Sequence, residues 1–412
     1  MNLIKLLKPA AIGAAIVVFA AMFSGCGSST SDSSEPTLAP TTEAQSRVSL
    51  DDRAEAKNGY GYESLDTDQK RSVYDTIGEY MHMSETEEFV LDGVTLAVFD
   101  EALGAYEADH PEEFWLDLGS RYSYVEYSES IGFELNFELE GDELNTAKET
   151  FSKKVDEITA SAPEEASDYQ MEIFVNDYLI DNCDYQSDAS MKHNAYGALV
   201  NGAAVCDGYA KAFQILCNRL GIECVGVNGY CPDFNKENGE SADTGHMWNC
   251  AKIGGDWYHV DVTWNDGDAH IQRYLYLNLT TEEIKKNHTI SPLYNDNEDP
   301  KDIYNVFVPE CTSEEYNYFK REYVTINNLD ESDELLAAFL QAVRNGDEYF
   351  DFLISEDLDY AEATQAISES YGYQWIEQVN EYNSGGAQIS TDSKFYTYEN
   401  INAVTFRLEY IE

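Results

Sequence analysis

Residues 203–213 read AAVCDGYAKAF, and this stretch decides how the middle of the chain is interpreted. Small and apolar residues recur from this stretch onward at spacings of 4, 3, 4 and 3. They are Cys206, Ala210, Phe213, Cys217 and Leu220. This period predicts an amphipathic helix that begins at Cys206. Gly221 follows it at the position where a left-handed residue commonly ends a helix.

A thiol in the first turn of that helix has unusual surroundings. Backbone N–H groups without helical partners and the positive end of the helix dipole stabilise a thiolate there. The same N–H groups could receive an oxyanion after the sulfur of Cys206 has attacked a carbonyl. Asp207 opposes thiolate formation, so the chemistry needs an additional cationic partner. The alternative is a buried structural cysteine.

Two further segments, GHMWN at 245–249 and WYHVDVTW at 257–264, predict a hairpin that turns at Gly254-Gly255. A two-residue turn makes the numbers of paired residues add up to 509, which places His246 opposite Thr263. Asp261 is then a diagonal neighbour of His246, with Cα atoms ~7–8 Å apart, unless the register slips by one residue. Cys206 as nucleophile, His246 as base and Asp261 as its orienting carboxylate would form a thiol triad.

Several assignments stay open at this point. His259 shares the predicted face of Asp261 and is the rival base, whereas His246 could be a solvated histidine at a strand end and Asp261 a surface carboxylate. The hydroxyls of Tyr185 and Tyr196 could help to hold an oxyanion, or both rings could belong to the core.

The three motifs together resemble the core of the transglutaminase-like superfamily, over about residues 171–278. The resemblance implies a papain-like α+β fold in which a cysteine at a helix start packs on an antiparallel sheet. It assigns the nucleophile to Cys206, the general base to His246 and the orienting carboxylate to Asp261. It also implies thiolate attack on a protein or peptide amide, followed by transfer to an amine (cross-linking) or to water (proteolysis or deamidation). We expect no cofactor and no metal.

The N-terminus predicts export. Two lysines precede the uncharged run Ala10–Phe23, whose 14 residues fall short of the roughly 20 that span a bilayer. Residues 1–25 are therefore interpreted as a signal peptide. The sequence FSGC at 23–26 resembles a bacterial lipobox, which would make Cys26 a diacylated, membrane-anchoring residue on the extracellular face. An ordinary secretory signal is the alternative.

The remaining chain divides by composition and pattern. A Ser/Thr/Pro-rich flexible linker at 26–58 precedes an N-terminal α+β module at 59–162, predicted as helix, helix, two strands, helix. The core domain is placed at 163–310 and a C-terminal α+β module at 323–412. The N-terminal module, with DHPE at 109–112, looks like the flank of acidic bacterial lipoproteins of this type. The C-terminal module has no histidine or cysteine and is a poor location for catalysis.

Charge and cysteine content limit the function. The net charge of −53 makes nucleic-acid binding implausible, because such binding depends on Lys and Arg. Cys217, Cys224 and Cys231 lie seven residues apart, which could indicate a metal site, but no CxxC pair accompanies them, so the sequence favours buried thiols over zinc for these three. Two other functions are considered: an inactive transglutaminase-fold surface lipoprotein that serves as a binding or scaffold module, and a cation-binding surface protein with Asp266-Gly267-Asp268. The latter segment lacks the ligand spacing of a calcium loop.

Overall fold

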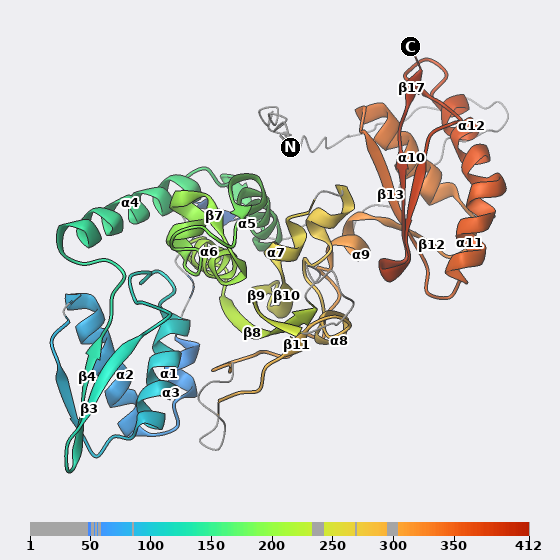
Figure 1. Ribbon diagram of the computed structural model, residues 1–412. Helices are drawn as coiled ribbons and strands as arrows, with labels where there is room; N and C mark the ends of the chain where they lie inside the picture. Colours follow the sequence, from blue (N-terminus) through green and yellow to red (C-terminus); the bar gives the residue numbers. More distant parts are fainter. Residues whose placement is uncertain are drawn as a thin grey trace, which may run out of the picture.

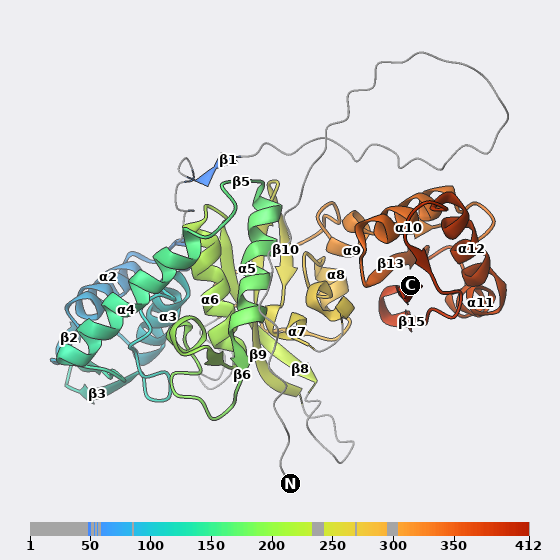
Figure 2. The ribbon, with the colours of Figure 1, turned by 90° about the horizontal axis from the view of Figure 1, so that it is seen from above.

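The computed structural model describes residues 48–50, 53, 56, 59–84, 86–232, 243–267, 270–294 and 304–411. The predicted signal peptide, the lipidation residue Cys26 and most of the predicted linker lie outside these residues. Three folded parts follow one another across the two views in chain order (Figures 1 and 2). Over the described ranges, no helix combines the length and the hydrophobicity that crossing a bilayer requires.

The N-terminal part packs helices on a small antiparallel sheet. Its helices are α1 (Tyr60–Ser64), α2 (Asp68–Met83) and α3 (Leu96–Asp109). The strands, in sheet order, are β2 (Phe89–Asp92), β4 (Ser130–Leu135) and β3 (Tyr122–Glu126). The predicted order omitted α1 and β2, because five and four residues are too few to display a helical or a strand period.

The middle part contains the predicted helix. Three long helices, α4 (Gly141–Thr159), α5 (Asp168–Asn182) and α6 (Cys206–Arg219), accompany a four-stranded antiparallel sheet. Its strands, in sheet order, are β10 (Asp256–Val260), β9 (Asp243–Ile253), β8 (Cys224–Pro232) and β11 (Thr289–Ile290). Two shorter pairs complete it: β1 (Val48–Ser49) with β5 (Glu165–Ala166), and β6 (Asp184–Tyr185) with β7 (Ala203–Ala204).

The two faces of this sheet differ. Asn249 Nδ2 donates a hydrogen bond to the carbonyl oxygen of Ala210 at 3.0 Å, which joins β9 to α6 on one face. Phe213 and Leu216 of α6 belong to a large buried cluster that continues into the N-terminal part. The opposite face carries a separate buried cluster that includes Val225, Val227, Trp248, Cys250, Leu279 and Cys311. The strand alternation therefore places Trp248 and Cys250 away from α6.

The β9–β10 hairpin has the predicted register but a different end. Ile253 pairs with Asp256, and φ values of 63° and 102° at the two turn glycines give the left-handed conformations that a two-residue turn requires. The prediction of a strand up to Trp264 is wrong, because β10 ends at Val260. Asp261 instead caps the short helix α7 (Val262–Asn265), accepting from the backbone N–H of Trp264 at 3.1 Å. Thr263 consequently does not pair with His246.

The C-terminal part has its own core around Phe339, Phe352 and Trp375. Its sheet, in order, consists of β12 (Val324–Ile326), β13 (Tyr349–Ile354), β16 (Ala403–Arg407) and β15 (Phe395–Tyr398). The helices are α9 (Tyr318–Glu322), α10 (Asp333–Asn345), α11 (Tyr360–Ala366) and α12 (Gly372–Tyr382), with the π-helical turn η4 (Ile367–Tyr371) between the last two. A further pair joins β14 (Gln388–Ile389) to β17 (Tyr410–Ile411).

Candidate active site

Cys206 is the first residue of α6 and is half-buried. The helix begins there because Val205 is extended and its N–H donates to the carbonyl oxygen of Lys192 at 3.0 Å. Gly208 in the same turn is required sterically, since a Cβ at this position would lie 2.5 Å from that carbonyl oxygen. No side chain caps this helix at Val205. The thiol therefore sits beside backbone N–H groups, as the sequence predicted.

The structure brings His246 and Asp261 into direct contact. The Nε2 atom of His246 lies 2.6 Å from Oδ2 of Asp261, and both side chains are buried. The thiols of Cys206 and Cys231 lie close enough to the same imidazole to raise its pKa. Because Nε2 faces the carboxylate, Nδ1 is the ring nitrogen left to exchange a proton with a thiol.

The charges of this group support one another. Burial opposes the positive charge of His246, but the Asp261 carboxylate outweighs it and raises the pKa of the imidazole well above its ordinary value. Burial likewise opposes ionisation of Asp261, yet the His246 charge and hydrogen bonds from His246 and His288 lower the pKa of the carboxyl. The His246 imidazolium thus provides the cationic partner that a thiolate beside Asp207 needs. Asp207 itself lies 2.9 Å from Nδ1 of His193.

A second histidine, which the sequence analysis missed, contacts the same carboxylate oxygen. Nε2 of His288 lies 3.0 Å from Oδ2 of Asp261, and the side chain of His288 is fully buried. Its Nδ1 lies 2.7 Å from the side-chain amide of Asn287, which in turn lies 2.6 Å from the hydroxyl of Tyr276. His288 is one histidine in a polar segment, without a spacing pattern that could have predicted this contact.

Aromatic rings surround the histidines. The Trp248 ring lies 5.9 Å from the His246 ring and the Trp264 ring 6.1 Å from it, between ring centroids. Tyr185 is 54% exposed and close enough to Cys206 and His246 for their charges to influence the pKa of its phenol. Tyr196 instead packs against Phe114 in the core, with the ring centroids 4.8 Å apart. Of the two tyrosine candidates, therefore, only Tyr185 lies near the Cys206 thiol.

The rival base, His259, has other partners. Its Nδ1 accepts a hydrogen bond from Trp248 Nε1 at 3.1 Å, and its Nε2 lies 3.3 Å from Oγ1 of Thr281. The side chain has no exposed surface. These contacts of His259 do not include Asp261, so of the two rival bases only His246 contacts this carboxylate.

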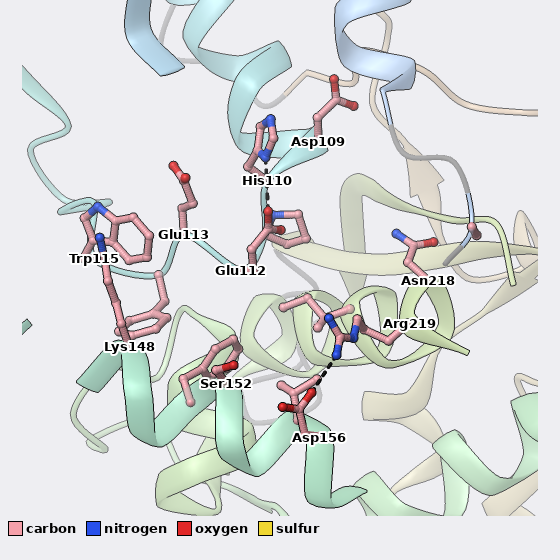
Figure 3. Close-up of a pocket in the computed structure, with 16 residues that line it drawn as sticks. Asp109, His110, Glu112, Glu113, Trp115, Lys148, Ser152, Asp156, Asn218 and Arg219 are labelled. Atoms are coloured by element: carbon pink, nitrogen blue, oxygen red, sulfur yellow. Dashed lines mark hydrogen bonds and ion pairs between the residues drawn. The ribbon is translucent and has the colours of Figure 1, made fainter. Parts of the chain in front are cut away.

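A cavity of about 410 Å³ lies near the C-terminal end of α6, not at Cys206 (Figure 3). Trp115, Lys148, Asp156 and Arg219 are among its lining residues, together with much of the 109–115 segment. Lys148 Nζ stands 3.6 Å from the centroid of the Trp115 ring. Asp109 of this segment has a structural role, since its carboxylate accepts from two N–H groups in the first turn of α1.

Comparison with known proteins relates the middle part to one superfamily. Residues 153–262 match the sequence model of the transglutaminase-like superfamily. Kyphoscoliosis peptidase of Mus musculus is 37% identical and that of Homo sapiens 39% identical, each over 76 residues. This overlap is 18% of the present chain and spans only 12% of the length of each peptidase.

Two solved structures show partial overlap. A structure described as that of a TGase is 13% identical with a TM-score of 0.26, covering 46% of this chain and 59% of the other. A protein of Cytophaga hutchinsonii, provisionally assigned as a cysteine protease, is 15% identical with a TM-score of 0.22, covering 43% and 65%. Residues 153–262 of this chain match the transglutaminase-like superfamily, and Cys206, His246 and Asp261 all lie within the matched residues.

Proposed function

We propose that the protein is a thiol enzyme that acts on protein or peptide amides through Cys206, His246 and Asp261. The observation that carries the proposal is the 2.6 Å contact between His246 and Asp261, made by an imidazole whose pKa is also raised by the neighbouring Cys206 thiol. The matching domain and the peptidase relatives support the same class of reaction.

The reaction begins with the sulfur of Cys206 attacking the amide carbonyl carbon. The resulting oxyanion is stabilised by N–H groups at the start of α6. His246 then donates its Nδ1 proton to the departing amine while the C–N bond breaks, which leaves a thioester on the sulfur. Asp261 keeps the ring oriented and stabilises its charged form.

A second nucleophile completes the cycle. Water attacking the thioester gives a carboxylic acid, and an amine gives a new amide; in both cases His246 accepts the proton and the thiol is regenerated. The strongly negative chain favours a cationic amine as acceptor. Amine transfer and hydrolysis are therefore separate outcomes of one acyl-enzyme.

Alkylation tests the nucleophile without a known substrate. Iodoacetamide at neutral pH should label Cys206 faster than the buried thiols, as read by peptide mass spectrometry over time. His246→Ala should slow this labelling, whereas Cys217→Ala, a buried thiol on the same helix, should leave it unchanged. Equal labelling rates for Cys206 in wild type and His246→Ala would contradict the proposal.

Turnover tests the reaction. Casein incubated with a fluorescent amine should gain fluorescence if the acyl group passes to amines, and peptide products or released ammonia should appear if water is the acceptor. Cys206→Ser should abolish whichever product is found. Absence of both products in wild type, together with slow alkylation, would refute an enzymatic function.

The location is part of the same proposal. Cys26, which lies outside the described residues, would carry two acyl chains and hold the domains on the extracellular face of the cell membrane. Cys26→Ala should move the protein from the membrane fraction to the soluble fraction. Unchanged fractionation would contradict lipid anchoring.

One observation favours a second candidate, a catalytically silent binding module. The 410 Å³ cavity lies away from Cys206 and combines apolar walls with Lys148, Asp156 and Arg219, a composition typical of ligand pockets (Figure 3). A protein that binds peptides with unchanged affinity after Cys206→Ser, but loses them after Trp115→Ala, would support this alternative.

A further inference from the structure

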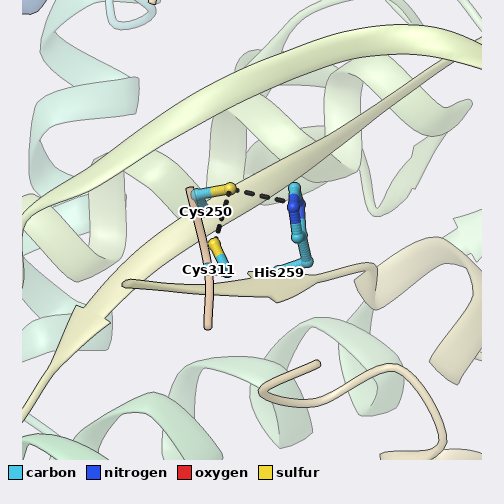
Figure 4. Close-up of side chains that lie close together, drawn as sticks. All are labelled: Cys250, His259 and Cys311. Atoms are coloured by element: carbon cyan, nitrogen blue, oxygen red, sulfur yellow. Dashed lines mark hydrogen bonds between the residues drawn. The ribbon is translucent and has the colours of Figure 1, made fainter. Parts of the chain in front are cut away.

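Three soft ligand groups converge on the face of the sheet opposite α6. Cys250 on β9 and His259 on β10 are directly paired across the hairpin. Cys311 arrives from a segment far along the chain, and its backbone is fixed to Thr281 by two hydrogen bonds, of 2.8 and 3.0 Å. Figure 4 shows the two sulfurs and the imidazole directed toward one another.

The distances suit a single ion. The two sulfurs are 3.8 Å apart, and Sγ of Cys250 lies 3.2 Å from Nδ1 of His259. Two thiolates at ~2.3 Å from one zinc ion, separated by a tetrahedral angle, would have their sulfurs ~3.8 Å apart. The observed spacing of the sulfurs therefore already equals that of two ligands on one zinc.

The surroundings favour a divalent, thiol-preferring ion. All three side chains are at most 1% exposed, and the apolar cluster around them includes Val225 and Leu279. A buried charge is costly unless it is compensated, and two thiolates compensate the two charges of Zn²⁺. Thiolate and imidazole ligands are those that zinc selects in proteins.

We propose that Cys250, His259 and Cys311 form a zinc site, separate from the thiol centre at Cys206. The ion is bound by the two sulfurs and by Nδ1 of His259, with two S–H protons released on binding. Trp248 donates its indole N–H to this same Nδ1 at 3.1 Å. Zinc therefore displaces the indole hydrogen bond, and a change in Trp248 fluorescence should accompany loading.

The site can be tested with Zn²⁺ alone. Full-length protein, reduced with a phosphine and freed of metal with a chelator, should bind one Zn²⁺ per chain with an upward Tm shift of roughly 5 °C. Cys250→Ala and Cys311→Ala should each lose the shift and the bound zinc. Cys217→Ala is the matched control for loss of a buried thiol. His288→Ala disrupts the other buried group of possible metal ligands, His246, Asp261 and His288. Both variants should keep the full Tm shift.

Fluorescence provides a readout that does not depend on stability. The emission change on adding Zn²⁺ should disappear in Trp248→Phe, while zinc stoichiometry by mass spectrometry stays at one. If Cys311→Ala fails to fold, Cys311→Ser replaces it, because the serine hydroxyl fills more of the volume left by the thiol than alanine does. Zinc binding that survives both cysteine substitutions, no zinc binding by wild type, or a Cys250–Cys311 disulfide found in its place would overturn the proposal.

Discussion

Two histidines on one hairpin, His246 and His259, have opposite surroundings. Both rings lie near Trp248, with centroids 5.9 and 6.3 Å from the indole. His246 contacts the carboxylate of Asp261, and the Cys206 thiol at a helix start helps to raise its pKa. His259 accepts the indole N–H and faces the thiol of Cys250 in a sealed apolar cluster.

The difference shows that the partner atom decides the chemistry available to an imidazole. A buried carboxylate acceptor raises the pKa of His246, so that its ring becomes a proton donor held in one orientation. At His259 the Nδ1 atom accepts the indole N–H of Trp248, so this nitrogen presents a lone pair, which is the group that a metal ion binds. Residue type and strand position alone would not have separated the two.

The largest effect is expected when the carboxylate of Asp261 is removed. Asp261→Asn should lower turnover or Cys206 alkylation by roughly 10³–10⁴-fold, because the amide stabilises the wrong tautomer of His246. Rates are measured by product formation or by mass spectrometry of alkylated peptide. Asp156→Asn, an exposed carboxylate near Arg219, is the control and should retain the wild-type rate. A loss of less than tenfold in a folded variant would remove Asp261 from the proposed mechanism.

His288 should have a smaller effect on the same centre. His288→Ala should slow Cys206 alkylation by about 10–100-fold, the usual size for a group that acts by orienting another. His288→Gln can still donate to Oδ2 of Asp261 and should recover part of the rate. In His288→Ala, the pH at which His246 loses its proton should also increase, because His288 no longer shares the Asp261 carboxylate. This shift is measured on the alkaline side of the pH–rate profile. An unchanged profile would indicate a purely structural residue.

The raised pKa of His246 makes its contribution to stability depend on pH. A group whose pKa is higher in the folded state stabilises the protein fully below its unfolded value, near 6.5, and loses this effect as the pH rises through the folded value. Wild type should therefore exceed His246→Asn in Tm by several degrees more at pH 6 than at pH 10. Thermal unfolding at the two pH values measures the difference, and a gap that grows with pH would contradict the ion pair.

The smallest effect on catalysis is expected from substitution of His259. His259→Phe should change Cys206 alkylation by less than about threefold. It should lower the free energy of unfolding by roughly 1–3 kcal/mol, because the Trp248 N–H loses its buried acceptor. Urea denaturation and alkylation rates are measured together. A tenfold slower alkylation of Cys206 in a variant of unchanged stability would instead support His259 as the general base.

Local pattern was sufficient for several features. The seam from Cys206 to Leu220 predicted α6 within one residue, and the turn glycines predicted the register of the hairpin. These features depend on neighbours in sequence, through helical period, strand alternation and turn conformation.

Other features needed contacts that sequence spacing does not encode. Asp261 was expected to reach His246 across a continued strand, but it does so from the cap of α7. His288 and Cys311 arrive from segments 27 and 61 residues away from Asp261 and Cys250, respectively. The sequence by itself determined the helix that presents the thiol and the turn that pairs the strands, because both follow from local backbone preferences. Only the tertiary structure decided which atoms face each imidazole, since packing brings those distant groups together.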